Sequence, residues 1–448
     1  MSTARSHWST RFAFILAAVG SAVGLGNLWK FPYMAGANGG GAFVLIYLLC
    51  IAAVGVPIFI AELYIGQKGQ KNAVASFEAT HEKNTPWRCI GFMGLASAFI
   101  ILSFYSVVGG WILDFSFKSI FNQFAGKSDE EVKGFLGALF ESPWTQVGWH
   151  FVFMTGTVGI VLGGVRNGIE KWNKILMPTL FALLGVLFIY SFTLSGFSQS
   201  ISFLFSPDTS KLTAAGVLEA VGHSFFTLSL GMGAIITYGS YLKKKEGLAK
   251  IAITVAFLDT LVALIAGVVI FSVVFTHGME PGGGPTLLFQ TLPVLFSKMT
   301  GGYILAVAFF LLVAFAAFSS SVSLLEVAVA YWVETKKKDR VRTTLLIGIV
   351  IFGIGVLSAL STNVLSDVKI FKFTFFDLFD KLTSSIFLPL GGVLISLFYG
   401  WVLGPKAIEE SLSLGKKPSL MKIGLLWTTR VLAPVAVMIV LVKGVMDF

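Results

Sequence analysis

Charged residues are scarce in this sequence: Asp, Glu, Lys and Arg make up 12% of the 448 residues, where an ordinary soluble domain has ~25%. The hydrophobic share is 55% and the mean hydropathy is +0.83, which excludes an ordinary globular enzyme. Because about 20 consecutive apolar residues cross a bilayer, a chain of this length can hold roughly ten or more spans. The composition therefore predicts an all-α polytopic membrane protein.

Other chemistry-bearing features are also sparse. Two cysteines, Cys50 and Cys89, cannot form a disulfide framework or a metal cage. Five histidines are scattered without ligand spacing, which makes a structural metal improbable. The sequence has no Walker A phosphate loop, which argues against an ATP-driven pump, and no nucleophile–base constellation, so we expect no enzyme.

Eleven apolar stretches are separated by polar or Gly/Pro-rich breaks. They fall at about 12–37, 41–66, 88–117, 147–164, 174–195, 214–240, 248–275, 302–333, 343–360, 374–403 and 424–446. Of the 33 Lys and Arg residues, 22 lie in one alternate set of connecting segments and 8 in the other. The positive-inside rule then predicts a cytoplasmic N-terminus and an extracellular C-terminus. Topology thereby explains the net charge of +10, and no nucleic-acid partner is needed.

Glycine, in contrast, is abundant, with 48 residues, about 11% against a usual ~7%. The run Gly20–Asn27 places three glycines near the middle of the first span, and Phe226–Gly233 repeats the anomaly in the sixth. One reading is close helix packing through small residues. The other is unwound backbone, which persists in a membrane only where it lines a cavity or ligand site. Interrupted spans at matching positions of two halves favour a midplane binding site.

Three segments carry a specific resemblance. They are GSAVGLGNLWKFPYMAGANGGGAF at 20–43, FFTLSLGMGAIITY at 225–238 and AAFSSSV at 316–322. Together they resemble the signature segments of the neurotransmitter:sodium symporter family. The resemblance implies one transporter domain over 1–448, built as an inverted five-plus-five repeat with spans 1 and 6 unwound. Residues 1–200 would be the first repeat, 201–404 the second and 405–448 span 11. Family members commonly have twelve spans, which leaves any dimer contact of the twelfth in doubt, and we predict no required protein partner.

The resemblance further implies two sodium sites. Site 2 would use the carbonyls of Gly20, Val23 and Ala316 with the hydroxyls of Ser319 and Ser320. The alternative is that these serines bond back to the preceding helical turn.

Site 1 would use Ala22, Asn27, Thr227, Asp259 and the carboxylate of the substrate. A bare carboxylate such as Asp259 costs ~2.5–3.5 kcal/mol inside a span, so a bound cation is a natural partner. The family usually has Asn at this position. We therefore expect Asp259 to replace a chloride ion, with a protonated or proton-coupled Asp259 as the alternative.

For the substrate, the resemblance implies a clamp for an amino acid. Amides around Ala22, Leu25 and Gly26 and the Tyr105 phenol would bind the α-carboxylate, and carbonyls at Phe226, Thr227 and Ser229 the α-ammonium. The full predicted set is Ser21, Ala22, Gly24, Leu25, Gly26, Ile101, Tyr105, Phe226, Thr227, Ser229, Met232, Ser320 and Leu324. Ordinary packing is the alternative for Tyr105 and Phe226. Because the side-chain pocket is mostly apolar and Met232 is flexible, we expect several hydrophobic L-amino acids, aromatic ones possible among them.

Gates are implied on both sides. Lys30 and Asp380, with Asp377 as an alternative partner, would form an outer gate that is looser than an Arg–Asp pair. An inner gate would contain Arg5, Trp8, Tyr241 and Glu334, for which a solvated surface cluster is the alternative.

Two further features of the family are expected. Glu62 resembles the carboxylate that holds the unwound sixth span. Gly168 and Pro178, with nine residues between them, resemble the family's site of cytoplasmic helix unwinding.

Residues 278–296 are expected to form an outer lid loop with short helices.

The sequence therefore predicts a chloride-independent symporter that imports hydrophobic L-amino acids with two Na⁺ by alternating access. A membrane sensor is the rival, although sensors usually add a signalling domain and we expect none here. A channel is a weaker third. The loops are short, and the sequence contains no N-x-Ser/Thr glycosylation acceptor in which x is a residue other than Pro. Both features indicate a bacterial plasma membrane.

Overall fold

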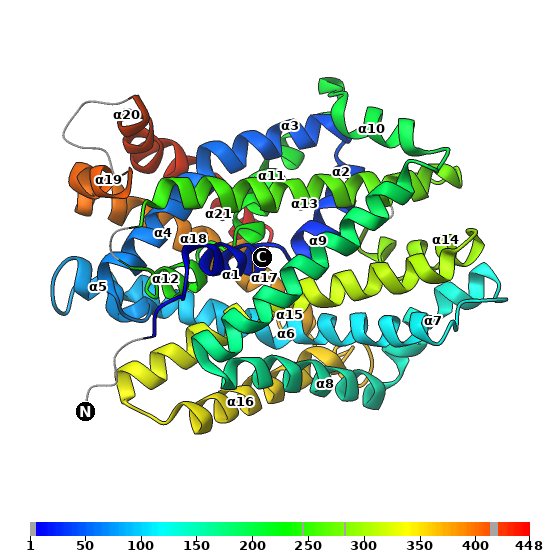
Figure 1. Ribbon diagram of the computed structural model, residues 1–448, viewed down its shortest axis with the longest axis horizontal. Helices are drawn as coiled ribbons and strands as arrows, with labels where there is room; N and C mark the ends of the chain where they lie inside the picture. Colours follow the sequence, from blue (N-terminus) through cyan, green and yellow to red (C-terminus); the bar gives the residue numbers. More distant parts are fainter. Residues whose placement is uncertain (1–5, 244–245, 282–283, 413–419) are drawn as a thin grey trace.

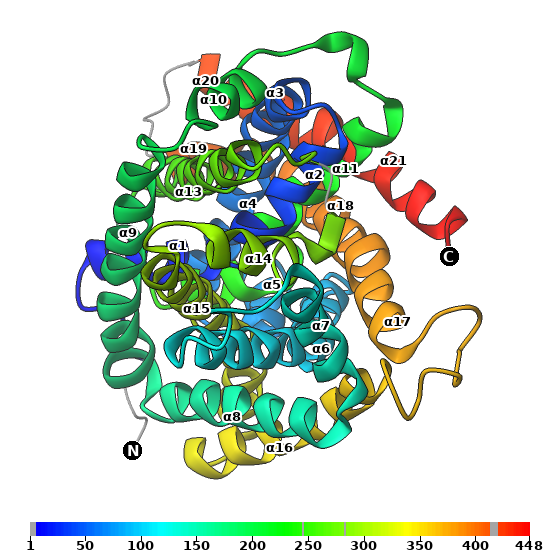
Figure 2. The same cartoon turned by 90° about the vertical axis from the view of Figure 1, so that its right-hand side faces the viewer.

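The computed structural model describes residues 6–243, 246–281, 284–412 and 420–448. In these ranges the chain is helical, and its β-structure is one isolated bridge between Ile370 and Phe373. The helices run mostly along the long axis of the molecule (Figures 1 and 2).

The elements of the first half are α1 (Arg11–Ala22), η1 (Gly26–Lys30), α2 (Phe31–Ala37), α3 (Gly41–Cys50), η2 (Ile51–Gly55), α4 (Val56–Gly69), α5 (Ala73–Thr80), α6 (Arg88–Ile120), α7 (Asp129–Glu141), α8 (Pro143–Leu162), η3 (Val165–Glu170), α9 (Lys171–Ser191) and α10 (Phe197–Phe205).

The second half continues the pattern of long helices joined by short ones. Its elements are η4 (Thr209–Lys211), α11 (Ala214–Thr227), α12 (Ala234–Gly239), α13 (Leu248–Thr276), η5 (Gly284–Leu287), α14 (Thr291–Lys298), α15 (Gly302–Lys336), α16 (Arg340–Leu360), α17 (Phe375–Lys381), η6 (Leu382–Phe387), α18 (Leu388–Leu397), η7 (Phe398–Leu403), α19 (Gly404–Leu412), α20 (Leu420–Trp427), η8 (Thr428–Leu432) and α21 (Ala433–Met446).

Nine helices in the described ranges are long and apolar enough to cross a membrane, or ten if one bent pair counts as a span. The bent pair is Arg11–Ala22 with Gly26–Ala37, which turn by 49° at the break. The predicted sixth span, 214–240, is divided into α11 of 14 residues and α12 of 6 residues, so neither piece is long enough alone. The fold class is therefore an all-α membrane protein, while the count of eleven spans and the inverted repeat stay predictions.

A helix break falls within the glycine-rich run of residues 20–27, whereas unwound spans stay a prediction. Helix α1 ends at Ala22, Val23 adopts an extended conformation, and the π-helical turn η1 begins at Gly26. The sixth span is interrupted from Leu228 to Gly233. Some backbone amides of both segments bond to side chains instead of to a helical carbonyl: the Gly24 amide donates to Asn27 and the Gly231 amide to Glu62.

Long helices surround the two interrupted spans. Helix α15 packs against α1, α6, α8, α9 and α12, and α13 packs against α1, α4 and α9. Figure 1 shows α5, α19 and α20 toward its left end and α7, α10 and α14 toward its right end. The first three helices belong to one predicted set of connecting segments or adjoin it, and the last three belong to the other set. Which end faces the cytoplasm is the prediction drawn from the Lys and Arg distribution.

Candidate functional site

An internal pocket of about 30 Å³ lies where the two interrupted spans meet α6 and α15. All thirteen residues of the predicted substrate-binding set line it, and Ser323 joins them. The set comes from α1 (Ser21, Ala22), the first break and η1 (Gly24, Leu25, Gly26), α6 (Ile101, Tyr105), α11 and the second break (Phe226, Thr227, Ser229, Met232) and α15 (Ser320, Leu324). Four distant parts of the sequence therefore contribute to one cavity.

The Tyr105 hydroxyl points toward this pocket. The side chain is 5% exposed, and its hydroxyl has no hydrogen-bond partner in the described part of the chain. A Cβ added at Gly24 would stand 3.2 Å from the Tyr105 Oη and 2.5 Å from the Ser320 Oγ. Glycine at position 24 thus leaves room between two hydroxyls. An unpartnered buried hydroxyl is costly, so a ligand oxygen is a suitable partner for it.

Asp259 anchors a buried polar cluster beside the pocket. The carboxylate is fully buried and accepts hydrogen bonds from Asn27 Nδ2 at 2.8 Å and from Thr227 Oγ1 at 3.0 and 3.1 Å. Asn27 Oδ1 accepts from the Gly24 amide at 3.0 Å. Among the described residues no Lys, Arg or His forms an ion pair with Asp259. The cluster has buried oxygens and an uncompensated carboxylate, a donor set that fits a hard cation.

A second group of oxygens surrounds Ser320. Its Oγ lies 3.3 Å from each of the carbonyl oxygens of Gly20, Ser21 and Val23. A hydroxyl carries one proton, so it cannot satisfy three carbonyls at once. Ser319 Oγ donates to the Ala316 carbonyl at 2.9 Å, which is the helical back-bond considered as the alternative. The structure therefore brings the predicted site 2 residues together, with convergent carbonyls that suit a cation.

Glu62 holds the break in the sixth span. Its buried Oε1 accepts a hydrogen bond from the Gly231 amide at 2.7 Å, which confirms the predicted contact. Gly231 has φ +78°, and a Cβ there would stand 2.6 Å from the Leu388 carbonyl oxygen. This position requires glycine both for its left-handed backbone and for the close approach of α18.

A larger cavity of about 360 Å³ adjoins the pocket on the side of α17. Leu25, Tyr105 and Phe226 line both cavities, so the last two side chains stand between them. The sequence predicts an ion pair between Lys30 and Asp380 here. Both residues line the cavity, but this conformation does not form the pair, because the Lys30 Nζ lies over the Phe226 ring, 4.6 Å from its centroid, a favourable cation–π position.

Trp8 closes the side of the pocket that lies opposite this cavity. It is 3% exposed, donates its Nε1–H to the Tyr238 carbonyl at 3.0 Å and packs edge-on against Tyr241. The Tyr241 hydroxyl donates to buried Glu326 at 2.8 Å, and Arg340 pairs with the same carboxylate at 2.5 Å.

Of the other two members of the predicted inner gate, one lies within the described residues and one does not. Glu334 accepts hydrogen bonds from the amide and side chain of Asn72 at 2.7 and 3.3 Å, and Arg5 lies outside the described residues. The four-residue gate therefore stays a prediction.

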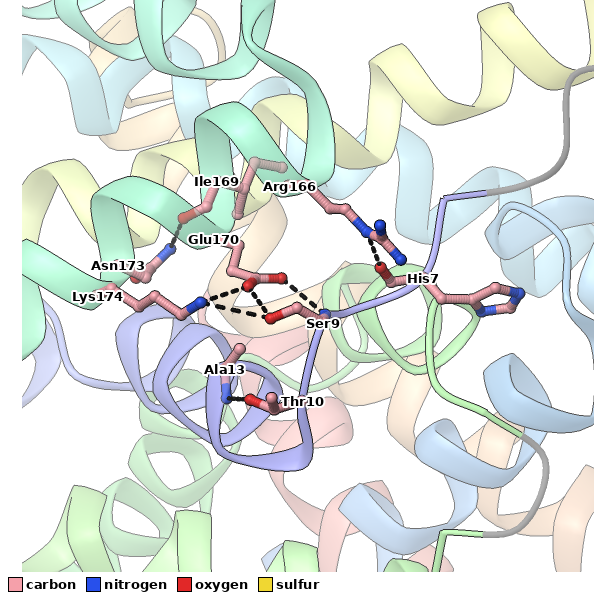
Figure 3. A network of polar contacts seen from close by, with 9 residues as sticks. All are labelled: His7, Ser9, Thr10, Ala13, Arg166, Ile169, Glu170, Asn173 and Lys174. Atoms are coloured by element: carbon pink, nitrogen blue, oxygen red, sulfur yellow. Dashed lines mark hydrogen bonds and ion pairs between the residues drawn. The ribbon is translucent and has the colours of Figure 1, made fainter.

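The segment that carries Trp8 is fastened to the start of the fifth span (Figure 3). Buried Glu170 accepts from the Ser9 amide at 3.0 Å and from the Ser9 hydroxyl, and it pairs with Lys174 at 2.6 Å. Arg166 donates to the His7 carbonyl at 2.8 Å. We name these five residues the N-terminal latch.

The two residues predicted to favour unwinding lie in the span Val165–Ser191, to which the latch binds. Gly168 lies in the π-helical turn η3, and Pro178 lies inside α9. Because proline has no amide hydrogen, α9 lacks one helical bond at Pro178. The local geometry is compatible with unwinding, which remains a prediction.

Several site residues were missed from the sequence. Glu326 and Arg340 were missed although an acid inside an apolar helix is the same signal that identified Asp259. Ser323 resembled an ordinary helical serine. Glu170 resembled a solvated surface acid, and its burial depends on where the N-terminal segment folds.

The comparisons with known proteins agree with this site. The model of the sodium:neurotransmitter symporter family matches residues 5–131 and 142–448. The chain belongs to this family, and it is accordingly a membrane transporter of the sodium-dependent class and not an enzyme.

Individual relatives and a solved structure support the assignment. The uncharacterized sodium-dependent transporter YhdH of Bacillus subtilis is 39% identical, over 87% of this chain and 86% of its own length. An uncharacterized sodium-dependent transporter of Haemophilus influenzae is 34% identical over 94% of each chain. The crystal structure of MhsT in complex with L-phenylalanine superposes with a TM-score of 0.91, at 46% identity, over 98% of this chain and 100% of that one.

Proposed function

We propose that this protein imports hydrophobic L-amino acids together with Na⁺ through the pocket between α1, α6, α11 and α15. The observation that carries the proposal is the position of this pocket between two oxygen clusters, one around Asp259 and one around Ser320. The similarity to MhsT, whose structure contains L-phenylalanine, supports a hydrophobic amino acid as the substrate.

The amino acid's two charged groups have suitable partners here. The Tyr105 hydroxyl and the amides of Leu25 and Gly26 would donate to an α-carboxylate, and helix N-termini favour anions. Carbonyls near Phe226 and Thr227, at the C-terminal end of α11, suit the α-ammonium. The apolar side chains of Ile101, Met232 and Leu324 leave an apolar region for the substrate side chain.

Substrate entry requires side chains to move. A pocket of about 30 Å³ is close to the room that a single water needs, so this conformation does not accommodate an amino acid. Phe226, which lies between pocket and outer cavity, and the flexible Met232 are the side chains that make room. The substrate would then enter from the cavity lined by Lys30 and Asp380.

Coupling follows from shared ligands. Ala22, Asn27, Thr227 and Asp259 would hold one Na⁺ at site 1, where the substrate carboxylate completes the oxygen shell. Each ligand then raises the affinity for the other by the same factor. The second Na⁺ would lie at site 2, among the carbonyls of Gly20, Val23 and Ala316 and the hydroxyls of Ser319 and Ser320.

Equilibrium binding of radiolabelled L-phenylalanine to the purified protein tests this arrangement. We expect binding in NaCl and little binding in KCl, with an affinity that rises with Na⁺ concentration. Equal binding in both salts would contradict the coupling.

The fixed charge of Asp259 makes the proposed carrier independent of chloride. Asp259 lies within the predicted site 1, so a bound anion has no charge to supply there. Exchange of chloride for gluconate at constant Na⁺ should leave L-phenylalanine binding unchanged. A loss of binding in gluconate would show that Asp259 does not replace chloride.

A further inference from the structure

Asn173 carries a buried side-chain oxygen that the site described above does not use. The residue lies in α9 and is 2% exposed. Its Nδ2 donates to the Ile169 carbonyl at 2.9 Å (Figure 3). Its Oδ1 has no hydrogen-bond partner in the described part of the chain. Leaving such an acceptor unsatisfied in the interior is unfavourable, so the position calls for a partner.

The orientation of the amide follows from this one bond. A backbone carbonyl only accepts hydrogen bonds, so the nitrogen of the amide must face Ile169 and the oxygen must face the other way. On that other side lie Gly20 and Ser319. The Cβ that Gly20 lacks would stand 3.2 Å from the Ser319 Cβ and 3.3 Å from the Asn173 Cγ, and it would overlap the Asn173 Oδ1. Glycine at position 20 therefore leaves room for the oxygen beside Gly20 and Ser319, two residues of the predicted site 2.

The two hydroxyls of the predicted site 2 already face carbonyl oxygens. The Ser319 hydroxyl donates its single hydrogen bond to the Ala316 carbonyl at 2.9 Å. The Ser320 hydroxyl is surrounded by three carbonyl oxygens at 3.3 Å. Another acceptor facing this group is unfavourable unless a cation binds among the oxygens, because oxygens are what a hard cation prefers.

We infer that the Asn173 Oδ1 is a further oxygen ligand of the sodium ion at site 2, contributed by α9, an inference that rests on the proposed sodium-coupled transport. The same side chain holds the Ile169 carbonyl in η3 through its nitrogen. Unwinding of the fifth span at Gly168 would therefore withdraw an oxygen from the ion. Loss of sodium affinity and opening of this helix are thus linked through one residue.

Two substitutions separate a sodium ligand from a purely structural asparagine. Asn173→Ala removes both the oxygen and the bond to Ile169, whereas Asn173→Asp removes the bond but keeps an oxygen and adds negative charge. The readout is ²²Na⁺ binding to the purified protein without amino acid, because site 1 then lacks the substrate carboxylate. Asn38→Ala is the control, since Asn38 makes the same bond to the carbonyl four residues earlier, Met34, at 2.9 Å, and belongs to neither predicted sodium site; its nitrogen also donates to Glu219 at 2.8 Å.

We expect the half-saturating Na⁺ concentration to rise roughly fivefold or more in Asn173→Ala, to fall below the wild-type value in Asn173→Asp, and to stay unchanged in Asn38→Ala. Wild-type affinity in Asn173→Ala, or equal weakening in both Asn173 variants, would overturn the inference. If Asn173→Ala does not fold, the aspartate variant decides alone: tighter binding supports the ligand, and unchanged or weaker binding overturns it. A wild-type protein that binds no Na⁺ would instead refute the proposed function and the inference with it.

Discussion

Buried acids in apolar helices mark the working parts of this protein at the scale of single residues. Asp259, Glu62 and Glu326 are each fully buried, and each has specific partners. Asp259 accepts hydrogen bonds from Asn27 and Thr227, and Glu62 accepts one from the Gly231 amide. Glu326 pairs with Arg340 and accepts a hydrogen bond from Tyr241. A carboxylate in a span is costly and is expected to serve a function. One acid lies at a proposed ion site, one binds the interrupted segment of the predicted sixth span, and one binds Tyr241 on the side of the molecule where Trp8 lies.

Gly24→Ala tests the space between the two pocket hydroxyls. The added Cβ would stand 2.5 Å from the Ser320 Oγ and 3.2 Å from the Tyr105 Oη, in the room proposed for the substrate carboxylate. We expect the affinity for L-phenylalanine to fall at least tenfold, about 1.4 kcal/mol, as measured by equilibrium binding. Gly185→Ala in α9, which meets nothing within 4 Å, is the control and should bind normally. Unchanged affinity in Gly24→Ala would exclude this space as the carboxylate site.

The pocket was predictable because the three signature segments fix which backbone is unwound and which side chains flank it. Glycine and polar residues in the middle of an apolar span have few explanations other than a ligand site. Asn173 and Glu170 were not predictable in this way. Both lie near the end of a span, where polar residues ordinarily face water. Their burial arises from contacts with residues about 150 positions away, near Gly20 and Ser9.

At the scale of elements, the two interrupted spans determine the site. The second break depends on Gly231, with φ +78° and room for no Cβ beside the Leu388 carbonyl. Gly231→Ala should destabilise the fold by ~2–4 kcal/mol, from left-handed backbone strain and overpacking, and lower the melting temperature in detergent. Gly222→Ala in α11, whose nearest contact would be 3.7 Å away, should melt like the wild type. If both variants do so, the break does not depend on this glycine.

The N-terminal latch joins the segment before α1 to η3 through Glu170. Glu170→Gln keeps the shape but removes the charge that Lys174 and Ser9 share, and charge-assisted hydrogen bonds contribute ~1.5–3 kcal/mol. Amide hydrogens of 165–175 should therefore exchange faster, by roughly tenfold, in hydrogen-exchange mass spectrometry. Glu82→Gln, in an exposed loop, should leave their exchange unchanged. Equal protection in wild type and Glu170→Gln would mean that the latch does not restrain this helix.

The positions of the long helices follow from apolar length, and most predicted stretches overlap a helix of the structure. Short amphipathic elements were harder to predict, since α7 and α10 lie between spans and were not expected. The short helices of the lid, η5 and α14, were expected in residues 278–296, of which 282–283 lie outside the described residues. The number of spans is ambiguous because helix breaks at the site make two spans discontinuous.

On the scale of the whole molecule, the pocket is closed unequally on its two sides. Toward the N-terminal segment, Trp8 and the latch form a packed closure. On the other side, a cavity of about 360 Å³ reaches the pocket at Tyr105 and Phe226. A carrier needs such asymmetry, because only one side of the site opens at a time. The structure fits the state in which the pocket is approached from the side of Lys30 and Asp380.

In the proposed function, a sodium gradient drives amino acids through this pocket. The most direct test is uptake of radiolabelled L-phenylalanine into proteoliposomes that contain the purified protein, with an inward Na⁺ gradient or with K⁺ replacing Na⁺ on both sides. The account predicts accumulation above the external concentration only with the gradient, and its collapse when a sodium ionophore is added. Accumulation that is equal in both salts, or absent with the Na⁺ gradient, would contradict it.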